Sequence, residues 1–314
     1  MTACSALSAP LALPQSPVFA RALPALGLGG EMRVLNAGGQ QVGRALVLSR
    51  DLPVRGQLRA ILRGPVWAGE TAPDDRAEAL RALGPMPPHL IEAAAPEPAL
   101  GPAGYGMVLT AGAVCWLDIA PSPAAGCWTA SAHPKWRASL NRAQGADLVV
   151  HEGRFKGAAA DWLLAQEAAM RQTRRYRSVA APVARALALR APGALHLLSA
   201  GSRASPDRII AAMLFAVHDG FATYLMGATS EAGRAHCAHH LLMAEAARLI
   251  RREGVRWIDL GQVDTGANPG LARFKLGTGA QLCPLGGSWL RLPSILPRRR
   301  TGKAGSPKAN PLKP

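Results

Sequence analysis

Short apolar runs, broken by glycine, aspartate and proline, dominate the N-terminal part of the chain. Strands are predicted at residues 32–35, 42–48, 58–66 and 106–119. One helix is expected over residues 74–83, because an aspartate can cap its start and Gly84 with Pro85 follows its end. Residues 87–102 are rich in proline and alanine and are expected to form a linker.

Longer amphipathic patterns begin at Trp136. Helices are predicted over residues 136–143, 158–174, 179–189 and 236–252. Strands are predicted at residues 147–151, 195–200, 208–218, 221–228 and 255–260, with a strand pair around 281–292. The dipeptide Asp219-Gly220 predicts a two-residue hairpin, because both residues tolerate positive φ.

This order of elements predicts an α/β (α+β) fold, in which helices flank a mixed sheet and one crossover helix lies near the end of the domain. Four segments are expected. They are a flexible leader at 1–30, a strand-rich companion module at 31–125, the mixed-sheet domain at 126–293 and a basic disordered tail at 294–314. Met32 is an alternative start to Met1.

Composition places the chain among globular proteins, since 49% of its residues are hydrophobic and no apolar run reaches the length of a membrane span. The five cysteines are scattered, which favours reduced thiols and a cytoplasmic location. A net charge of +16 would suit a polyanionic partner. However, the basic tail and a general excess of arginine over lysine account for much of it, so nucleic acid is not indicated. The tail could instead contact anionic lipid at the inner membrane.

The segment Ile258-Asp259-Leu260-Gly261 is followed by a loop and then by Phe274-Lys275-Leu276-Gly277. This conjunction resembles the FemABX-like branch of the GNAT (Gcn5-related acetyltransferase) superfamily, in which a strand ending in Asp-Leu-Gly leads to a Phe-Lys motif. Residues 136–143 are similar to the arginine-containing helix that opens the domain in that branch. The resemblance covers about half of the chain and implies a GNAT-like mixed sheet in the C-terminal half. The smaller N-terminal module is then expected to be either a reduced GNAT-like module or a strand-rich one.

The resemblance implies N-acyl transfer from acetyl-CoA or another acyl-CoA to an amine. Lys275, in the Phe-Lys motif with Phe274, is expected to stabilise the oxyanion that forms when the amine attacks the acyl carbonyl. Asp264 is the candidate general base. Asp259 could serve as a base or brace the end of its strand.

The donor is expected beside the strand at 221–228, near the N-terminus of the helix at 236–252, where free backbone amides attract phosphate. Candidate donor contacts are Met226, Gly227, Arg234 and His236. Candidate contacts to the other substrate are Trp136, Arg137, Arg142, Arg174 and Asn268. The acceptor is expected to be an amine of a small molecule or of a cell-envelope component. The oligomeric state stays open.

Two departures from family patterns keep other functions open. The stretch Gly233-Arg234-Ala235-His236-Cys237-Ala238 lacks the usual pyrophosphate-binding signature of GNAT enzymes, and Thr278 replaces an aromatic residue found in aminoacyl-tRNA-dependent members. The alternatives are an aminoacyl-tRNA-dependent transferase acting on a cell-wall precursor and a catalytically silent binding module. No metal is predicted, because the sequence indicates no third ligand to accompany His236 and His240.

Overall fold

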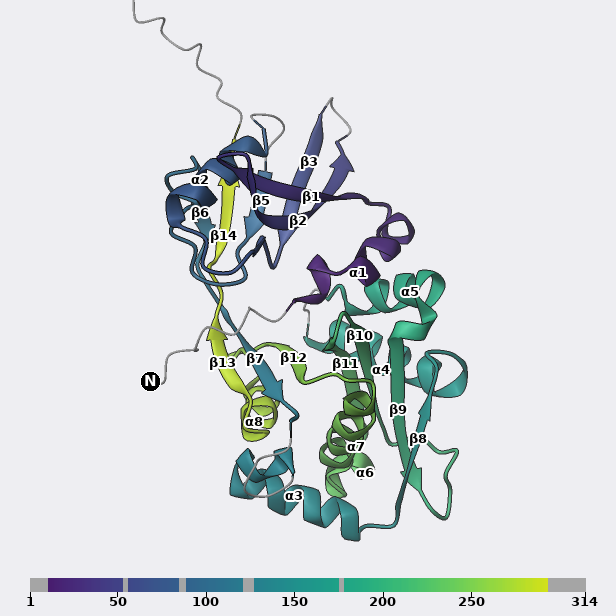
Figure 1. The fold of residues 1–314 in the computed structure, drawn as a ribbon. Coiled ribbons are helices and arrows are strands. Elements are labelled where there is room, and N and C mark those ends of the chain that lie inside the picture. The colour runs from purple at the N-terminus through teal and green to yellow at the C-terminus, as the bar shows by residue number, and fades with distance from the viewer. Residues whose placement is uncertain (1–10, 53–55, 85–88, 121–126, 175–177, 293–314) are drawn as a thin grey trace, which may run out of the picture.

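The computed structural model describes residues 11–52, 56–84, 89–120, 127–174 and 178–292. Two mixed sheets stand side by side, with helices around the second, and the α/β class predicted from the sequence is confirmed (Figure 1). The expected basic tail lies outside the described residues. Within the described part of the chain, no helix is long and apolar enough to cross a membrane.

The first sheet has the strand order β1-β2-β3-β5-β14-β6, with β4 paired to β2. Its strands are β1 (Gly29–Ala37), β2 (Gln40–Asp51), β3 (Gln57–Leu62), β4 (Val66–Trp67), β5 (His89–Glu92), β6 (Gly106–Leu109) and β14 (Ser288–Arg291). Strands β3 and β5 are parallel, and helix α2 (Pro73–Ala82) lies between them in the chain. The other pairs in this sheet are antiparallel.

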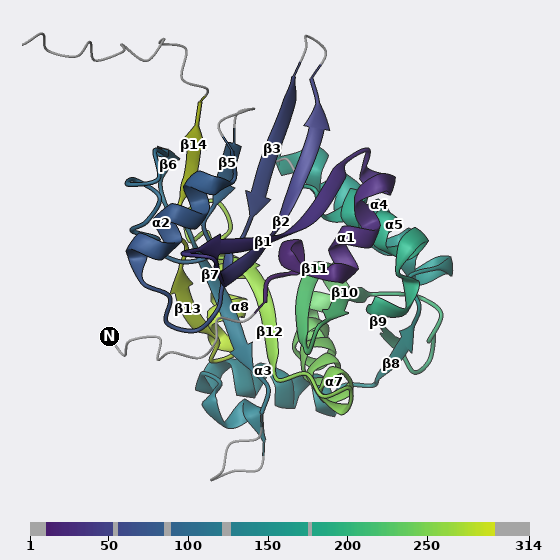
Figure 2. The ribbon, with the colours of Figure 1, turned by 45° about the horizontal axis from the view of Figure 1, so that its top comes forward.

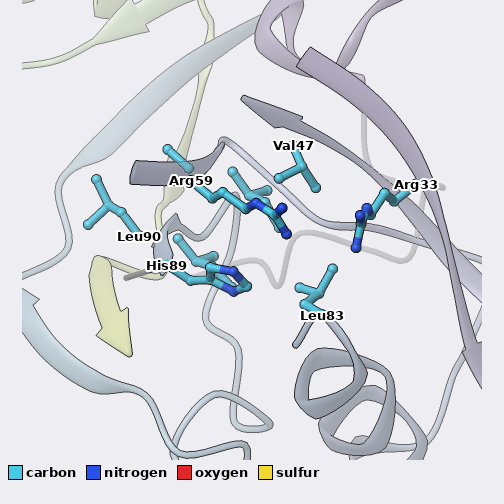
Figure 3. Close-up of a pocket in the computed structure, with 9 residues that line it drawn as sticks. Arg33, Val47, Arg59, Leu83, His89 and Leu90 are labelled. Atoms are coloured by element: carbon cyan, nitrogen blue, oxygen red, sulfur yellow. The ribbon is translucent and has the colours of Figure 1, made fainter. Parts of the chain in front are cut away.

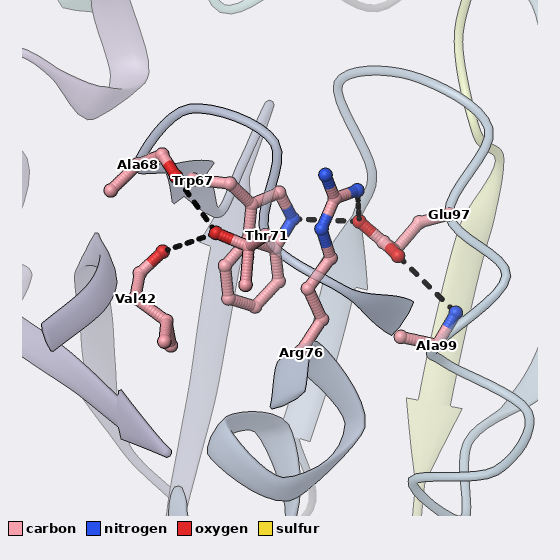
Figure 4. Close-up of polar contacts among 7 residues, drawn as sticks. All are labelled: Val42, Trp67, Ala68, Thr71, Arg76, Glu97 and Ala99. Atoms are coloured by element: carbon pink, nitrogen blue, oxygen red, sulfur yellow. Dashed lines mark hydrogen bonds and ion pairs between the residues drawn. The ribbon is translucent and has the colours of Figure 1, made fainter. Parts of the chain in front are cut away.

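A buried carboxylate holds α2 against its neighbours in the first sheet (Figure 4). Glu97 accepts hydrogen bonds from Trp67 Nε1 at 2.6 Å, Arg76 Nη1 at 3.3 Å and the Ala99 amide at 3.2 Å. The Arg76 guanidinium also lies 5.5 Å from the Trp67 ring centroid. These contacts tie β4, α2 and the chain after β5 together, because a buried carboxylate is stable only when it is well bonded.

The second sheet has the order β13-β7-β12-β11-β10-β9-β8. Its strands are β7 (Ala113–Asp118), β8 (Leu148–Gly153), β9 (Leu195–Ser202), β10 (Ala211–His218), β11 (Phe221–Thr229), β12 (Trp257–Gln262) and β13 (Gln281–Pro284). Its helices are α3 (Pro134–Gly145), α4 (Gly157–Arg174), α5 (Ala180–Arg190), α6 (Glu231–Ala235), α7 (Ala238–Arg252) and α8 (Pro269–Gly277). Strands β11 and β12 are the parallel pair, and α7 is their crossover helix.

Alternating residues of β10 explain why both faces of this sheet are covered. Ala212, Leu214 and Ala216 belong to the core formed with α4 and α5. Ala211, Met213 and Phe215 belong to the core formed with α3 and α7. Because successive strand side chains point to opposite faces, β10, which is apolar from Ala211 to Val217, is a central strand between two helical layers. Figure 1 shows α7 in front of the sheet and α4 behind it.

Several sequence predictions are confirmed within a few residues. The hairpin between β10 and β11 turns at Asp219 and Gly220, whose φ angles are 45° and 79°. Helices α2, α3, α4, α5 and α7 occupy the predicted segments. Helix α7 begins at Ala238 rather than at His236, because the preceding Cys237 adopts a left-handed conformation.

The expected flexible leader is wrong for residues 11–28. This segment forms η1 (Leu13–Gln15), α1 (Pro17–Ala22) and η2 (Leu23–Leu26), and buries Leu13, Val18, Phe19 and Leu23. Helix α1 packs against α5, so the segment joins the first sheet to the second (Figure 2). The prolines of this segment suggested a coil, but in the structure they stand at the first turns of short helices, where proline is favoured.

Three further expectations are corrected: the linker at 87–102, the module boundary at residue 125 and the strand pair at 281–292. The expected linker at 87–102 contains β5, which lies inside the first sheet with neighbours on both sides. Strand β7 precedes the boundary yet belongs to the second sheet, and β14 follows it yet belongs to the first. The predicted strand pair at 281–292 is therefore two strands in different sheets. The two halves of the chain therefore exchange strands: β14 lies between β5 and β6 in the first sheet, and β7 lies between β13 and β12 in the second.

Candidate functional site

The parallel strands β11 and β12 diverge after a short paired region. They are in register only from Phe221 with Trp257 to Thr223 with Asp259. Beyond this point β11 continues to Thr229 and β12 to Gln262 without pairing to each other. Both strands are also irregular here. The pairing of β11 with β10 leaves out Leu225, and the pairing of β12 with β7 leaves out Leu260. Backbone groups of two central strands thus become available to a ligand, since they no longer bond to each other.

A cavity of about 790 Å³ opens between α3, α8 and the first turn of α7. Aromatic rings form one wall. The Trp136 ring lies 5.1 Å from His240, 5.6 Å from Trp128 and 6.2 Å from Phe274, centroid to centroid. Lys135 and Arg273 also line the cavity. A volume of this size, with a mainly apolar lining and a few polar groups, is typical of sites for small ligands and cofactors.

Two buried nitrogen atoms belong to residues that line this cavity. Trp136 Nε1 and His240 Nδ1 have no hydrogen-bond partner among the described residues. An unsatisfied buried polar atom costs about 1–3 kcal/mol, so a ligand that bonds to either atom would recover part of that cost. Burial also lowers the pKa of His240, which keeps its ring neutral near pH 7.

Lys275 occupies the opposite side of α8 from the cavity. Its side chain is 6% exposed, and its Nζ donates a hydrogen bond of 2.8 Å to the Gln262 carbonyl, at the end of β12. Burial lowers the pKa of Lys275, whereas the charges of Cys115 and Asp259 raise it. The ammonium group therefore lies at the end of β12, beyond the residues of β12 that pair with β11.

Asp259 connects this strand end to the first sheet. Its Oδ1 accepts the Gly261 amide at 2.7 Å, and its Oδ2 lies 3.3 Å from Arg63 Nη2. Arg63 follows β3 and has a φ of 53°, and the side chains of the pair are 12% and 4% exposed. The bracing role considered for Asp259 therefore has a structural basis. Sequence reasoning missed Arg63, because its partner is distant in the chain.

Replacing Arg63 with methionine is expected to lower the free energy of unfolding by about 1.5–3 kcal/mol, the range for a hydrogen bond to a charged group. The full cost of an unpaired buried carboxylate is not expected, because Asp259 keeps the Gly261 amide and the nearby Lys275. Urea denaturation followed by tryptophan fluorescence measures the change. The control is Arg203→Met, since the Arg203–Asp147 pair is largely exposed. Equal effects of the two substitutions would contradict a stabilising role for the contact between sheets.

Comparison with protein families agrees with this geometry. Residues 134–276 match the family model described as an acetyltransferase (GNAT) domain. The domain formed by these residues belongs to the GNAT superfamily. This family match indicates an acyltransferase, and the matched region contains the diverging strands, Lys275 and most of the residues that line the cavity.

Solved structures are similar in fold to this chain over both sheets. FemX aligns with a TM-score of 0.68 at 14% identity, over 90% of this chain and 92% of FemX. The C-terminal domain of a putative lysylphosphatidylglycerol synthetase from Agrobacterium fabrum gives 0.53 at 15% identity, over 88% and 87%. A conserved protein of unknown function from Bacteroides thetaiotaomicron gives 0.55 at 14% identity, over 88% and 90%. The chain thus has a FemX-like fold. No curated protein matches it in sequence.

The structure places two of the remaining predicted residues at the cavity of the GNAT domain. Trp136 and Phe274 line it. Arg137 lies beside them on α3, but its Nη1 donates to the carbonyls of Ala130 and Ala132 at 2.9 and 3.0 Å, which braces the preceding turn. Arg142 is exposed near the end of α3, and the side chain of Arg174 lies outside the described residues. Sequence reasoning missed Trp128, which reaches the cluster from a turn without periodic pattern.

The predicted base and its neighbour lie in the loop before α8. Asp264 is exposed, and its Oδ1 accepts the amides of Gly266 and Ala267 at 2.9 and 2.8 Å. These bonds shape the turn, so the carboxylate has a structural partner. Asn268 stands at the start of α8 without a side-chain capping bond. The loop ends in a helix that was not predicted, and this helix directs Phe274 and Lys275 to different sides.

The structure places the predicted donor contacts near β11 in different surroundings rather than around one site. Met226 is 5% exposed and packs in the core with α4 and α5, on the other face of the sheet from the cavity. A Cβ added at Gly227 would lie 2.4 Å from the Tyr224 hydroxyl, so the glycine permits a close approach of that side chain. Arg234 donates to the Thr229 carbonyl at 3.0 Å, and His236 is exposed after α6. Among the residues described, no three His, Cys, Asp or Glu side chains gather as a metal site.

Proposed function

We propose that this protein transfers an acyl group from acyl-CoA to an amine, with acetyl-CoA as the first donor to test. The observation that carries the proposal is the divergence of β11 and β12 beside an aromatic cavity at the start of α7. The diverging strands offer backbone groups to the donor, and the cavity offers apolar surface and two unbonded nitrogens. The acceptor amine belongs to a small molecule or a cell-envelope component.

In this proposal the amine nitrogen attacks the thioester carbonyl and a tetrahedral oxyanion forms. The carbon–sulfur bond then breaks, and CoA leaves as a thiol once the amine has lost its proton. Lys275 stabilises the oxyanion by its charge. The Gln262 carbonyl uses one of the three donors of its ammonium group, which leaves capacity for a substrate oxygen. Asp264 stays the candidate base.

An aminoacyl-tRNA-dependent transfer is the second candidate. It is supported by the FemX-like arrangement of both sheets, which spans 90% of the chain, and by the missing pyrophosphate signature around Arg234. The short helix α6 and the left-handed Cys237 occupy that stretch. Thermal stabilisation separates the two donors, because a ligand that binds only the folded state raises the melting temperature. Stabilisation by charged tRNA but not by acyl-CoA would favour the second candidate.

Replacing Phe274 with alanine is expected to weaken acetyl-CoA binding by about 10- to 100-fold, because burying an aromatic side chain contributes about 1.5–3 kcal/mol. Isothermal titration calorimetry measures the dissociation constant. The matched control is Phe155→Ala, which truncates another half-buried phenylalanine, next to a different cavity. Weakening in the control alone, or in neither variant, would argue against donor binding between α3 and α8.

A further inference from the structure

Three positively charged side chains surround His89 on the first sheet. In the strand register, His89 of β5 stands opposite Arg59 of β3 and opposite Arg291 of β14. Directly opposed residues share a face of the sheet, so the three side chains emerge in one row. Arg33 on β1 faces the same space. Figure 3 shows the guanidinium groups of Arg33 and Arg59 and the imidazole of His89 turned toward one another.

His89 is buried and incompletely bonded. Its side chain is 5% exposed, and Nε2 has no hydrogen-bond partner among the described residues. A small cavity of about 10 Å³ lies beside it, lined by Arg33, Arg59, Val47 and Leu83 among others. This volume is about that of one water-sized probe, so it admits a single oxygen atom and no larger group.

The balance of charge around this cavity is positive. Arg291 donates to the carbonyls of Leu80, Gly84 and Ala103 and stacks on Tyr105. Arg33 bonds Glu31 through Nε at 3.1 Å. Arg59 bonds Gln57 through Nε at 3.3 Å. No described residue accepts a hydrogen bond from the terminal nitrogens of Arg33 or Arg59.

The positive charge also acts on His89 itself. Burial, followed by the charges of Arg291, Arg59 and Arg33, lowers the pKa of His89 to about 4, so its ring is neutral near pH 7. A neutral imidazole can carry its proton on Nε2 and donate it.

We propose that Arg33, Arg59 and His89 bind the phosphate group of a small ligand. One phosphate oxygen enters the small cavity and accepts the His89 Nε2 proton. The remaining oxygens stay at its mouth, where the terminal nitrogens of Arg33 and Arg59 bind them, since guanidinium groups match phosphate geometry. The site lies on the face of the first sheet that packs on α2, and its lining residues are distinct from those of the cavity between α3 and α8. It is therefore independent of the proposed acyl transfer.

Isothermal titration calorimetry with inorganic phosphate tests the proposal, with ionic strength held constant by chloride. Arg33→Gln and Arg59→Gln are each expected to raise the dissociation constant about tenfold or more, because each removes a charged donor. The control is Arg44→Gln, an exposed arginine on β2 outside this cavity. Wild-type affinity in both site variants, or equal weakening in the control, would overturn the site. So would a chloride response equal to the phosphate response.

Two further measurements sharpen the test without relying on a variant at the buried histidine. Phosphate should raise the pKa of His89 in an NMR titration of the ring protons, because a nearby anion favours the imidazolium form. An unchanged titration of His89 at saturating phosphate would overturn its part in the site. Glycerol 3-phosphate distinguishes the source: tighter binding than inorganic phosphate indicates a phosphate monoester, and weaker binding indicates the free ion.

Discussion

Replacing Lys275 with alanine is expected to lower kcat by roughly 100- to 1000-fold, as the loss of an oxyanion-stabilising donor does. The dissociation constant of the donor should change far less, because the interaction strengthens mainly in the transition state. Steady-state kinetics with acetyl-CoA and an identified acceptor, together with calorimetric binding, measure the two quantities. Near-normal kcat with weakened donor binding would make Lys275 a binding residue instead.

The burial of Lys275 adds a control that the sequence did not suggest. Because its Nζ bonds the Gln262 carbonyl and its side chain is 6% exposed, alanine also leaves a void and an unbonded carbonyl. Lys275→Met keeps most of the volume without the charge and should lose as much kcat as alanine with a smaller loss of stability. Lys275→Arg should not restore the rate, since a planar guanidinium places its charge differently. A kcat that follows the melting temperature across the three variants would assign Lys275 a structural role.

Deleting residues 1–28 is expected to prevent stable folding. The deleted segment buries Leu13, Val18, Phe19 and Leu23 between the two sheets. Each such side chain contributes about 1.5–3 kcal/mol, so the four together contribute about 6–12 kcal/mol. That sum rivals the whole stability of a typical protein, about 5–15 kcal/mol. The yield of soluble protein and the cooperativity of its thermal unfolding measure the result.

Single substitutions in α1 provide the controls for this deletion. Phe19→Ala should cost about 3–5 kcal/mol, because it leaves a cavity in the core. Arg21→Ala, on the exposed side of the same helix, should change stability by less than about 0.5 kcal/mol. A deletion variant that unfolds cooperatively at the wild-type temperature would show that the segment is dispensable.

The sequence by itself determined the elements whose signals are local. Helix α7 follows from apolar residues at helical spacing, and the β10–β11 hairpin follows from Asp219-Gly220. The Asp-Leu-Gly and Phe-Lys motifs were enough to indicate the GNAT superfamily. These features need only neighbouring residues, or a motif of fixed spacing, to be recognised.

Only the tertiary structure decided which sheet each strand joins and what surrounds the site. Strands β7 and β14 read alike as short apolar runs, yet they enter different sheets, because strand pairing depends on partners far along the chain. Gln15 looks like a polar residue of a leader, but its side chain bonds Leu62 O and Leu46 N at 2.7 and 2.8 Å in place of a strand partner. Arg63 meets Asp259 only after both sheets have formed. Such contacts leave no periodic pattern, since the energy of a buried polar pair depends on burial and geometry that the fold alone creates.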